Sequence, residues 1–253
     1  MICKLECPSL AAPLFGDWPE TILWSCLQGV MGAVYVDDPE RPRCAMAHLG
    51  DFRFFAGEPD GALAAFCPPD CKRGFSLLIP QNEAWSACIA GTYGGRARRI
   101  TRYATKKEPS FQREQLKAFV DALPESYTIC NIDEKLYHLC RRTAWSRDLV
   151  GQFPTWENFC HLGLGFCVLL SERPVAGAAS YSRYREGIEI EIDTHPDFRR
   201  RGLARACGSK LILECLDRSL YPSWDAHDRT SLGLAEQLGY QLDHPYTAFE
   251  ITG

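Results

Sequence analysis

A run of three arginines and a glycine stands where a strand-like pattern changes to a helix-like one. Arg199, Arg200 and Arg201 precede Gly202. The apolar residues that follow recur every four positions and are Leu203, Cys207, Leu211 and Cys215. A helix start already carries about half a positive charge, so further cations there are unfavourable unless an anion binds among them. Unpaired N–H groups and a glycine that permits close approach suit a phosphate or pyrophosphate. The pattern indicates an anion site, and a solvated arginine run is the alternative.

Carboxylates occupy one face of the preceding strand pattern. From Gly187 to Thr194, isoleucines alternate with Glu189, Glu191 and Asp193. A carboxylate in a partly dry cleft can accept the proton of an amine, directly or through water. Glu189 is the first candidate for such a base, Glu191 is the second, and Asp193 is weaker. The alternating pattern alone would equally predict that the strand face carrying these carboxylates is simply exposed to solvent.

The stretch Arg199-x-x-Gly202-x-Ala204 resembles the acyl-CoA-binding motif of the GNAT superfamily of N-acetyltransferases. An acidic strand and a proline turn precede it, and an amphipathic helix, a strand-like YPSWDA and a helix ending in Leu238-Gly239-Tyr240 follow in the family's order. The segments THPDFRRRGLA and PSWDAHDRTSLGLAEQLGY are similar to the branch that includes zwittermicin A resistance-type acetyltransferases. In that branch a GNAT domain follows a less recognisable N-terminal domain.

The resemblance implies acetyl-CoA as co-substrate. The pantetheine arm would pair with strand backbone, and amides from Arg199 through Ala204 would hold the pyrophosphate. The residues expected to contact acetyl-CoA are Ile192, Asp193, Thr194, Arg199, Arg200, Arg201, Gly202, Leu203, Ala204 and Asp228. Many family members place a glutamate base on this strand, which again favours Glu189 or Glu191.

Two positions depart from the family pattern. Ala235 stands where many members carry a tyrosine, and Asp228 replaces a common asparagine. Both changes leave open which group protonates the departing thiolate. Trp224, Asp225 and His227 lie in the same region of the sequence.

Composition limits the classes of protein. The chain has 253 residues, a net charge of -4 and 46% hydrophobic residues, enough for one large or two small domains. A mildly acidic chain gives no electrostatic case for nucleic acid. The longest apolar run, residues 162–170, is too short to cross a bilayer, and the N-terminus lacks a secretory pattern. We therefore expect a cytoplasmic protein with neither nucleic-acid nor membrane partners. The sequence does not determine the oligomeric state, and a homodimer is one of the alternatives.

The thirteen cysteines do not have zinc-site spacing. They contain no C-x-x-C pair, and Cys3/Cys7 and Cys67/Cys71 each have three residues between them. His48, His138 and His161 lack partners at metal spacing. We expect mostly buried, reduced thiols and no metal, and we expect His195 to be structural or exposed.

The element pattern predicts an α/β (α+β) chain in two parts. Residues 1–123 are expected to form a mixed α/β domain that ends in a linking helix over residues 111–123, and a degenerate GNAT-like copy would also fit. Residues 124–253 are expected to form the GNAT domain, with a central mixed, mostly antiparallel sheet flanked by helices. Strands are predicted at residues 30–37, 44–49, 52–55, 74–80, 96–105, 127–132, 165–170, 175–183, 187–194 and 221–226. Helices are predicted at residues 20–28, 61–66, 82–90, 133–141, 146–152 and 156–163, from 203 onward and before 239, with residues 1–18 as a loop.

Three functions follow from these residues. The first is an N-acetyltransferase acting on the primary amine of a small molecule, an antibiotic included, with the segment from Trp145 to Trp156 near the acceptor. Asp148, Glu157 and Glu172 could supply countercharge to a cationic acceptor. The second is a non-catalytic acyl-CoA-binding sensor with the same fold, suggested by the two departures above. The third, protein acetylation, is disfavoured because the N-terminal domain would crowd a peptide groove.

Overall fold

The computed structural model describes residues 2–69, 71, 74–107 and 111–252, which form two compact units. The first unit is Met1–Ala104 with His244–Gly253, and the second is Thr105–Asp243. This division differs from the expected boundary after residue 123. Helix α5 (Arg113–Asp121) packs against α8 (Leu203–Asp217) in the second unit, and the last strand, β13 (Leu242–Thr252), pairs with β5 (Phe75–Pro80) in the first.

The first unit is built on a mostly antiparallel sheet in which β4 and β5 run parallel. Its strands lie in the order β1 (Cys3–Lys4), β2 (Ala33–Val36), β3 (Cys44–Leu49), β4 (Phe52–Gly57), β5, β13 and β6 (Ala97–Thr105). Its helices are α1 (Ala12–Phe15), α2 (Thr21–Leu27), α3 (Gly61–Ala65) and α4 (Glu83–Tyr93), with 3-10 turns η1 (Pro8–Ala11) and η2 (Gly94–Arg96). Every residue of β3 is buried, as expected for a strand covered on both faces. Residues 8–15, expected to be a loop, form helical turns.

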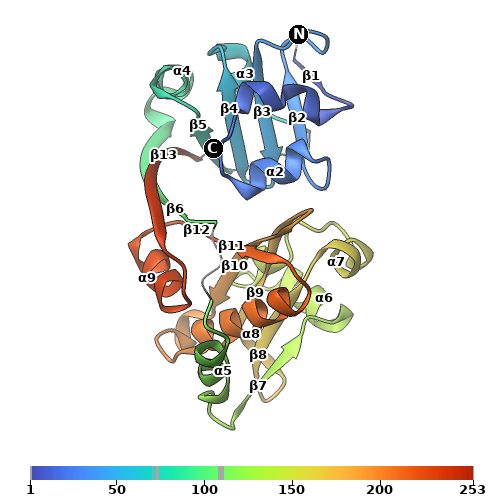
Figure 1. The fold of residues 1–253 in the computed structure, drawn as a ribbon, viewed down its shortest axis with the longest axis vertical. Helices are drawn as coiled ribbons and strands as arrows, with labels where there is room; N and C mark the ends of the chain where they lie inside the picture. Colours follow the sequence, from blue (N-terminus) through green and yellow to red (C-terminus); the bar gives the residue numbers. More distant parts are fainter. Residues whose placement is uncertain (1, 70, 72–73, 108–110, 253) are drawn as a thin grey trace. The chain divides into compact units, whose positions relative to one another are not determined.

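The sheet of the second unit has the order β11 (Tyr221–Ser223), β10 (Gly187–Thr194), β9 (Arg173–Tyr184), β8 (Gly165–Leu170) and β7 (Tyr127–Asn131). The β10–β11 pair is parallel and the other neighbours are antiparallel, which confirms the predicted mixed sheet. Figure 1 shows α8 beside α5. The remaining elements are α6 (Glu134–Arg142), η3 (Arg147–Leu149), α7 (Trp156–Leu162), η4 (Pro196–Phe198), β12 (Asp225–Ala226) and α9 (Arg229–Gln237).

Helix α8 covers one face of this sheet with the predicted apolar stripe. Leu203, Cys207, Leu211 and Cys215 are at most 1% exposed. A side chain at Gly208 would meet Ile192 of β10 at 2.9 Å, so helix and strand are in close contact. The other face carries η3, since Leu149 fills the space above Gly177 of β9. Two predictions fail locally: residues 146–152 form a short 3-10 turn rather than a helix, and residues 221–226 divide into β11 and β12 around Trp224.

None of the helices that the structure describes is both long and apolar enough to span a membrane. All thirteen cysteines are free thiols, but the expectation that most of them are buried is wrong. Six are buried, namely Cys26, Cys44, Cys140, Cys167, Cys207 and Cys215.

Candidate active site

The parallel strands β10 and β11 separate after a short pairing. They are in register from Gly187 opposite Tyr221 to Glu189 opposite Ser223, whereas β10 continues along β9 to Thr194. The β9 register also skips Tyr181 between Glu189 and Ile190, a bulge of the kind that increases local twist. Beyond Glu189, the edge of β10 that faces away from β9 has no strand partner among the described residues. This edge can pair with an extended ligand as an added strand would.

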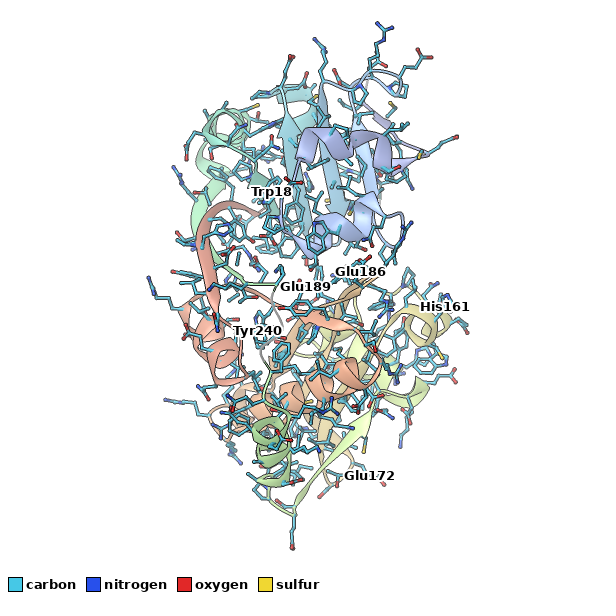
Figure 2. The ribbon with its side chains drawn as sticks, viewed as in Figure 1. Trp18, His161, Glu172, Glu186, Glu189 and Tyr240 are labelled. Atoms are coloured by element: carbon cyan, nitrogen blue, oxygen red, sulfur yellow. The ribbon has the colours of Figure 1, made fainter. Side chains whose placement is uncertain are left out.

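Glu189 lies at the point of separation and is 3% exposed. Its Oε1 accepts the backbone N–H of Asp225 at 2.6 Å, just after β11 ends. Burial, and in smaller part the Glu189 charge, raise the pKa of Tyr184, Tyr221 and Tyr240 above the ordinary value for tyrosine. Figure 2 labels Glu189 and Tyr240 within this unit. The Glu189 carboxylate therefore connects β10 to the chain that follows β11 through a hydrogen bond. The solvent-facing position that the alternating pattern allowed for Glu189 is not observed.

Glu191 and Asp193 lie further along β10, on the face opposite α8. Glu191 pairs with Ala179 and Asp193 with Gly177, and both acidic residues are half-buried. Burial, followed by the charge of Asp148 in η3, raises the pKa of Asp193 to about 6, and Arg199 acts in the opposite direction. Two carboxylates from separate segments thus share this face of the sheet.

Replacing Asp193 with asparagine should raise stability at alkaline pH. The carboxyl has a higher pKa in the folded chain than its ordinary value of 3.8, so the folded state holds the proton more tightly. The contribution of this carboxyl to folding stability is fully present below about pH 4, where it is neutral in both the folded and the unfolded chain. It is lost as pH rises to about 6, and above that pH the buried charge of the folded chain destabilises the fold. We expect the Asp193→Asn variant to melt about 2–4 °C higher than the wild type at pH 8, with a smaller difference at pH 4.5. Thermal unfolding at both pH values tests this, and an equal difference at both would contradict it.

The loop before α8 exposes a series of backbone donors. Arg200 and Gly202 have positive φ angles, 60° and 77°. The N–H groups of residues 200–205 have no acceptor among the described residues, and α8 begins at Leu203. Turns that direct neighbouring N–H groups to one side, at a helix start, bind anions. The loop therefore presents backbone donors of the kind a phosphate needs, and phosphate binding there remains a prediction.

Two of the three arginines are bound to their own loop. Arg199 Nε donates to the carbonyl of Thr194 at 3.3 Å, and Arg201 donates to the carbonyl of Asp197 at 3.1 Å. The Arg201 guanidinium also lies 5.0 Å from the centre of the Phe198 ring. The exposed Arg200 side chain makes no hydrogen bond or ion pair within the part of the chain described. Arg200 is therefore the cation that is most available to an anion here.

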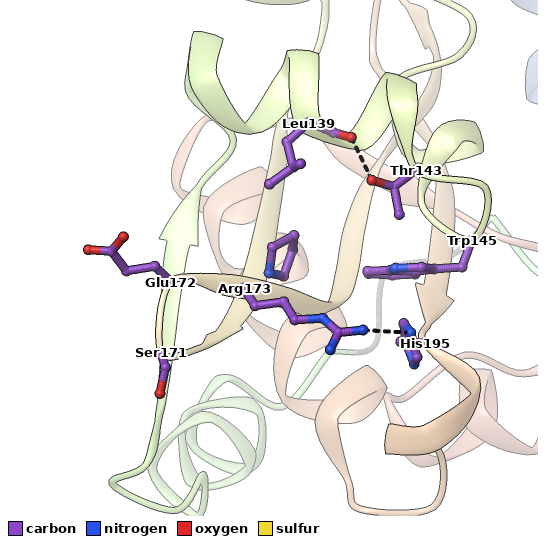
Figure 3. Close-up of a pocket in the computed structure, with 8 residues that line it drawn as sticks. Leu139, Thr143, Trp145, Ser171, Glu172, Arg173 and His195 are labelled. Carbon is purple, nitrogen blue, oxygen red and sulfur yellow. Dashed lines mark hydrogen bonds between the residues drawn. The ribbon is translucent and has the colours of Figure 1, made fainter.

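A pocket of about 350 Å³ lies where β10 ends (Figure 3). It is lined by Leu139, Thr143, Trp145, Ser171, Glu172, Arg173, Pro174 and His195. Arg173 Nη2 lies 3.0 Å from His195 Nε2, and the Trp145 ring meets the His195 ring edge to face at 5.9 Å. His195 Nδ1 accepts the N–H of Asp197 at 3.3 Å, so the expected structural role of this histidine in the turn has a contact to support it. The pocket offers an aromatic wall and one guanidinium next to the turn that leads to the arginines.

The remaining predicted residues have defined structural contacts. Asp228 caps α9, because its Oδ1 accepts the N–H of Ser231 at 2.8 Å. Tyr240 donates its hydroxyl hydrogen to the carbonyl of Pro222 at 2.6 Å, which fits the buried position of this residue. Ala235 is fully buried. A contact of Asp228 with the cofactor remains a prediction, and none of these contacts identifies the group that protonates the thiolate.

The carboxylates proposed as countercharges are dispersed. Asp148 faces Asp193, whereas Glu157 is at the exposed start of α7, where the Thr155 hydroxyl lowers its pKa. Figure 2 places Glu172 at the opposite end of the sheet from Glu189. Among the described residues, no group of His, Cys, Asp and Glu side chains is arranged to hold a metal ion.

Sequence reasoning missed Arg173 and the tyrosines around Glu189. Arg173 follows a two-residue hairpin at Ser171 and Glu172, both at positive φ, and an arginine after a turn carries no functional signal. Tyr184 and Tyr221 belong to strand ends far apart in the sequence. A search for polar residues at the ends of parallel strands could have found Tyr221 but not the effect of the Glu189 charge on its pKa.

A mostly antiparallel sheet whose one parallel pair separates in front of a glycine-led helix start is the arrangement of the GNAT fold. The model of the family described as GNAT acetyltransferase matches residues 12–249. A curated relative, an uncharacterized N-acetyltransferase YdfB of Bacillus subtilis, is 24% identical over 261 residues, covering 98% of this chain and 97% of that protein.

Solved structures agree with this fold. A GCN5-related N-acetyltransferase-like protein from Streptococcus suis is 50% identical and superposes with a TM-score of 0.92 over 97% of this chain and 98% of that one. A tandem GNAT protein from the clavulanic acid biosynthesis pathway gives a TM-score of 0.54 at 9% identity over 100% and 98% of the two chains, which is a likeness of fold. The chain belongs to the GNAT acetyltransferase family and is an acyltransferase.

Proposed function

We propose that this enzyme transfers the acetyl group of acetyl-CoA to the primary amine of a small molecule. The observation that carries the proposal is the open edge of β10, which runs from Ile190 to Thr194 and leads to the Arg199–Ala204 loop. An extended arm could hydrogen-bond along this edge while its pyrophosphate meets the N–H groups of residues 200–205. The cytoplasm, where acetyl-CoA is available, is the location that fits this chemistry.

The proposed base is Glu191, the second of the two sequence candidates. Glu189 is 3% exposed and accepts the Asp225 N–H at 2.6 Å, so an amine or a relaying water has little access to its carboxylate. Glu191 is half-buried on the open stretch of β10 and is better placed to receive a proton through water. The amine nitrogen would attack the thioester carbonyl, its proton would pass to Glu191, and the C–S bond would break to release the thiolate, which water can protonate.

The acceptor is proposed to be cationic before it reacts. Asp148 and Asp193 place negative charge on the face of β10 that also carries Glu191. An ammonium group that approaches this face would be attracted, and it would release one proton to water before the neutral amine attacks and passes its second proton to Glu191. Amine-bearing antibiotics are one class of small molecule with this chemistry.

Release of free CoA thiol measures the proposed reaction directly. Acetyl-CoA should bind in the absence of an amine, and at least one member of a panel of small primary amines should accelerate thiol release. Mass spectrometry should find the amine heavier by one acetyl group. If acetyl-CoA binds and neither small amines nor lysine peptides accelerate release, the proposal is wrong and non-catalytic acyl-CoA binding takes its place. Acetylation of a lysine peptide as fast as the best small amine would instead point to a protein acceptor.

A further inference from the structure

An arginine in the first unit is buried, and the described residues provide no carboxylate that pairs with its charge. Arg53 of β4 is 4% exposed, and its guanidinium makes no ion pair within the described chain. Its partners are the Phe66 carbonyl (3.3 Å from Nη1), the Tyr93 hydroxyl (3.5 Å), the Ser76 hydroxyl (3.1 Å from Nη2) and the sulfurs of Cys71 (2.6 Å) and Cys67 (3.8 Å). Its Nε is buried and has no hydrogen-bond partner among the described residues. Burying a charge in this way is costly unless an anion accompanies it.

A pocket of about 350 Å³ adjoins this guanidinium. Its described lining is Arg53, Ala65, Cys67, Cys71, Gly74, Phe75, Ser76, Thr92, Tyr93, Arg96 and Ile251. This lining includes two arginines and neither aspartate nor glutamate. The volume is at the low end of the roughly 300–1,000 Å³ that small-molecule sites occupy. The described lining therefore carries positive charge around a space suited to a small ligand.

In the described lining, the Tyr93 and Thr92 hydroxyls and the Cys67 thiol add no negative charge. The Tyr93 hydroxyl donates to the Ala64 carbonyl at 3.0 Å, and the Thr92 hydroxyl donates to the Cys88 carbonyl at 2.8 Å. Burial, and then the neighbouring Cys71, raise the pKa of the Cys67 thiol, so this thiol is neutral near pH 7. Arg96 is exposed, and its guanidinium lies 5.4 Å from the centre of the Tyr93 ring. The pocket thus offers donors and cations to whatever enters it.

We propose that this pocket binds a small ligand through a carboxylate or phosphate group that pairs with Arg53. The oxyanion would lie beside the guanidinium and offset the buried charge, and Arg96 would add a second cation. The pocket belongs to the first unit, whereas the open edge of β10 and the Arg199–Ala204 loop belong to the second. It is therefore a ligand site separate from the proposed acetyl-CoA site.

Thermal unfolding with inorganic phosphate and with acetate, each compared with chloride at equal ionic strength, tests the proposal. Either oxyanion should raise the melting temperature of the wild type, because a ligand that binds the folded state stabilises it. The Arg53→Met variant should lose that rise. In chloride it should be at least as stable as the wild type, since a buried charge is removed. A response to phosphate indicates a phosphate ligand and a response to acetate a carboxylate ligand.

Two control variants separate this site from other effects. Arg102 is a second buried arginine of the same unit, 5% exposed, which does not line the pocket, so Arg102→Met should keep the oxyanion response. Phosphate could also bind at the Arg199–Ala204 loop, and the Gly202→Val variant distinguishes the two sites. This variant should retain the part of the rise in melting temperature that depends on Arg53. Absence of any oxyanion response in the wild type, or an equal response in Arg53→Met, would overturn the proposal.

Thiol labelling gives a measurement that does not depend on a folded Arg53 variant. Cys67 is exposed at the pocket, and mass spectrometry can follow its modification among the other cysteines. In the wild type, the labelling rate of Cys67 should fall by about half when the oxyanion concentration equals its Kd. The exposed Cys160 of the second unit should label at an unchanged rate. If Cys67 labelling does not change over the concentrations that raise the melting temperature, the oxyanion binds elsewhere and the proposal fails.

Discussion

A Gly202→Val variant should bind acetyl-CoA at least about ten-fold more weakly than the wild type, a loss of about 1.4 kcal/mol or more. Gly202 has a φ of 77°, and a β-branched residue is strained in that region. A Cβ built there meets only the Arg205 guanidinium, at 3.9 Å, so the unliganded fold has room for it. The cost should fall on the loop conformation that presents the N–H groups of residues 200–205, and isothermal titration with acetyl-CoA measures it.

The matched control for this variant is Gly233→Val. Gly233 is in α9 of the same unit, a built Cβ there meets nothing within 4 Å, and its φ is not positive. Gly233→Val should have the same affinity for acetyl-CoA as the wild type. This equality should remain when any change in the melting temperature of the variant is taken into account. An unchanged affinity in Gly202→Val, with Gly233→Val behaving alike, would count against the proposed pyrophosphate site.

The elements around the candidate site follow from short-range patterns. The predicted bounds of residues 187–194 and 165–170 match β10 and β8, because alternation or a continuous apolar run defines each of them. The stripe of α8 is equally local, and Gly202 stands at the positive-φ position before that helix. These features depend on residues a few positions apart, so the sequence was sufficient to predict them.

The environment of each carboxylate could not be predicted in this way. Alternation placed Glu189 on a polar face, but the segment that covers it arrives 36 residues later, at Asp225. The charge of Asp148 acts on Asp193 because η3 lies on this face, whereas the sequence suggested a longer helix there. The grouping of β13 with the first unit is likewise a long-range pairing, between Phe249 and Leu78. Contacts of this kind depend on tertiary structure, to which local propensity gives no access.

The second large effect is expected at Glu191. Replacing it with glutamine keeps the size and the hydrogen-bonding capacity of the side chain but removes the group that would accept the proton. We expect kcat to fall about 10²–10⁴-fold, while the Kd for acetyl-CoA stays within about two-fold. In the pH profile of kcat/KM, the limb that reports the base should disappear from the variant. Thiol release with the best amine of the panel provides both measurements.

Glu189 provides the comparison that decides between the two glutamates. In Glu189→Gln the amide oxygen can still accept the Asp225 N–H, so we expect a small loss of stability and a kcat within about ten-fold of the wild type. Glu189→Ala leaves the buried Asp225 N–H without that acceptor and should cost about 1–3 kcal/mol of folding free energy. Glu186→Gln, at an exposed position of the β9–β10 hairpin, should change neither quantity. If Glu189→Gln loses the larger part of kcat at an unchanged melting temperature, while Glu191→Gln retains activity, then Glu189 is the base. The Asp225 N–H would in that case serve to orient the catalytic carboxylate.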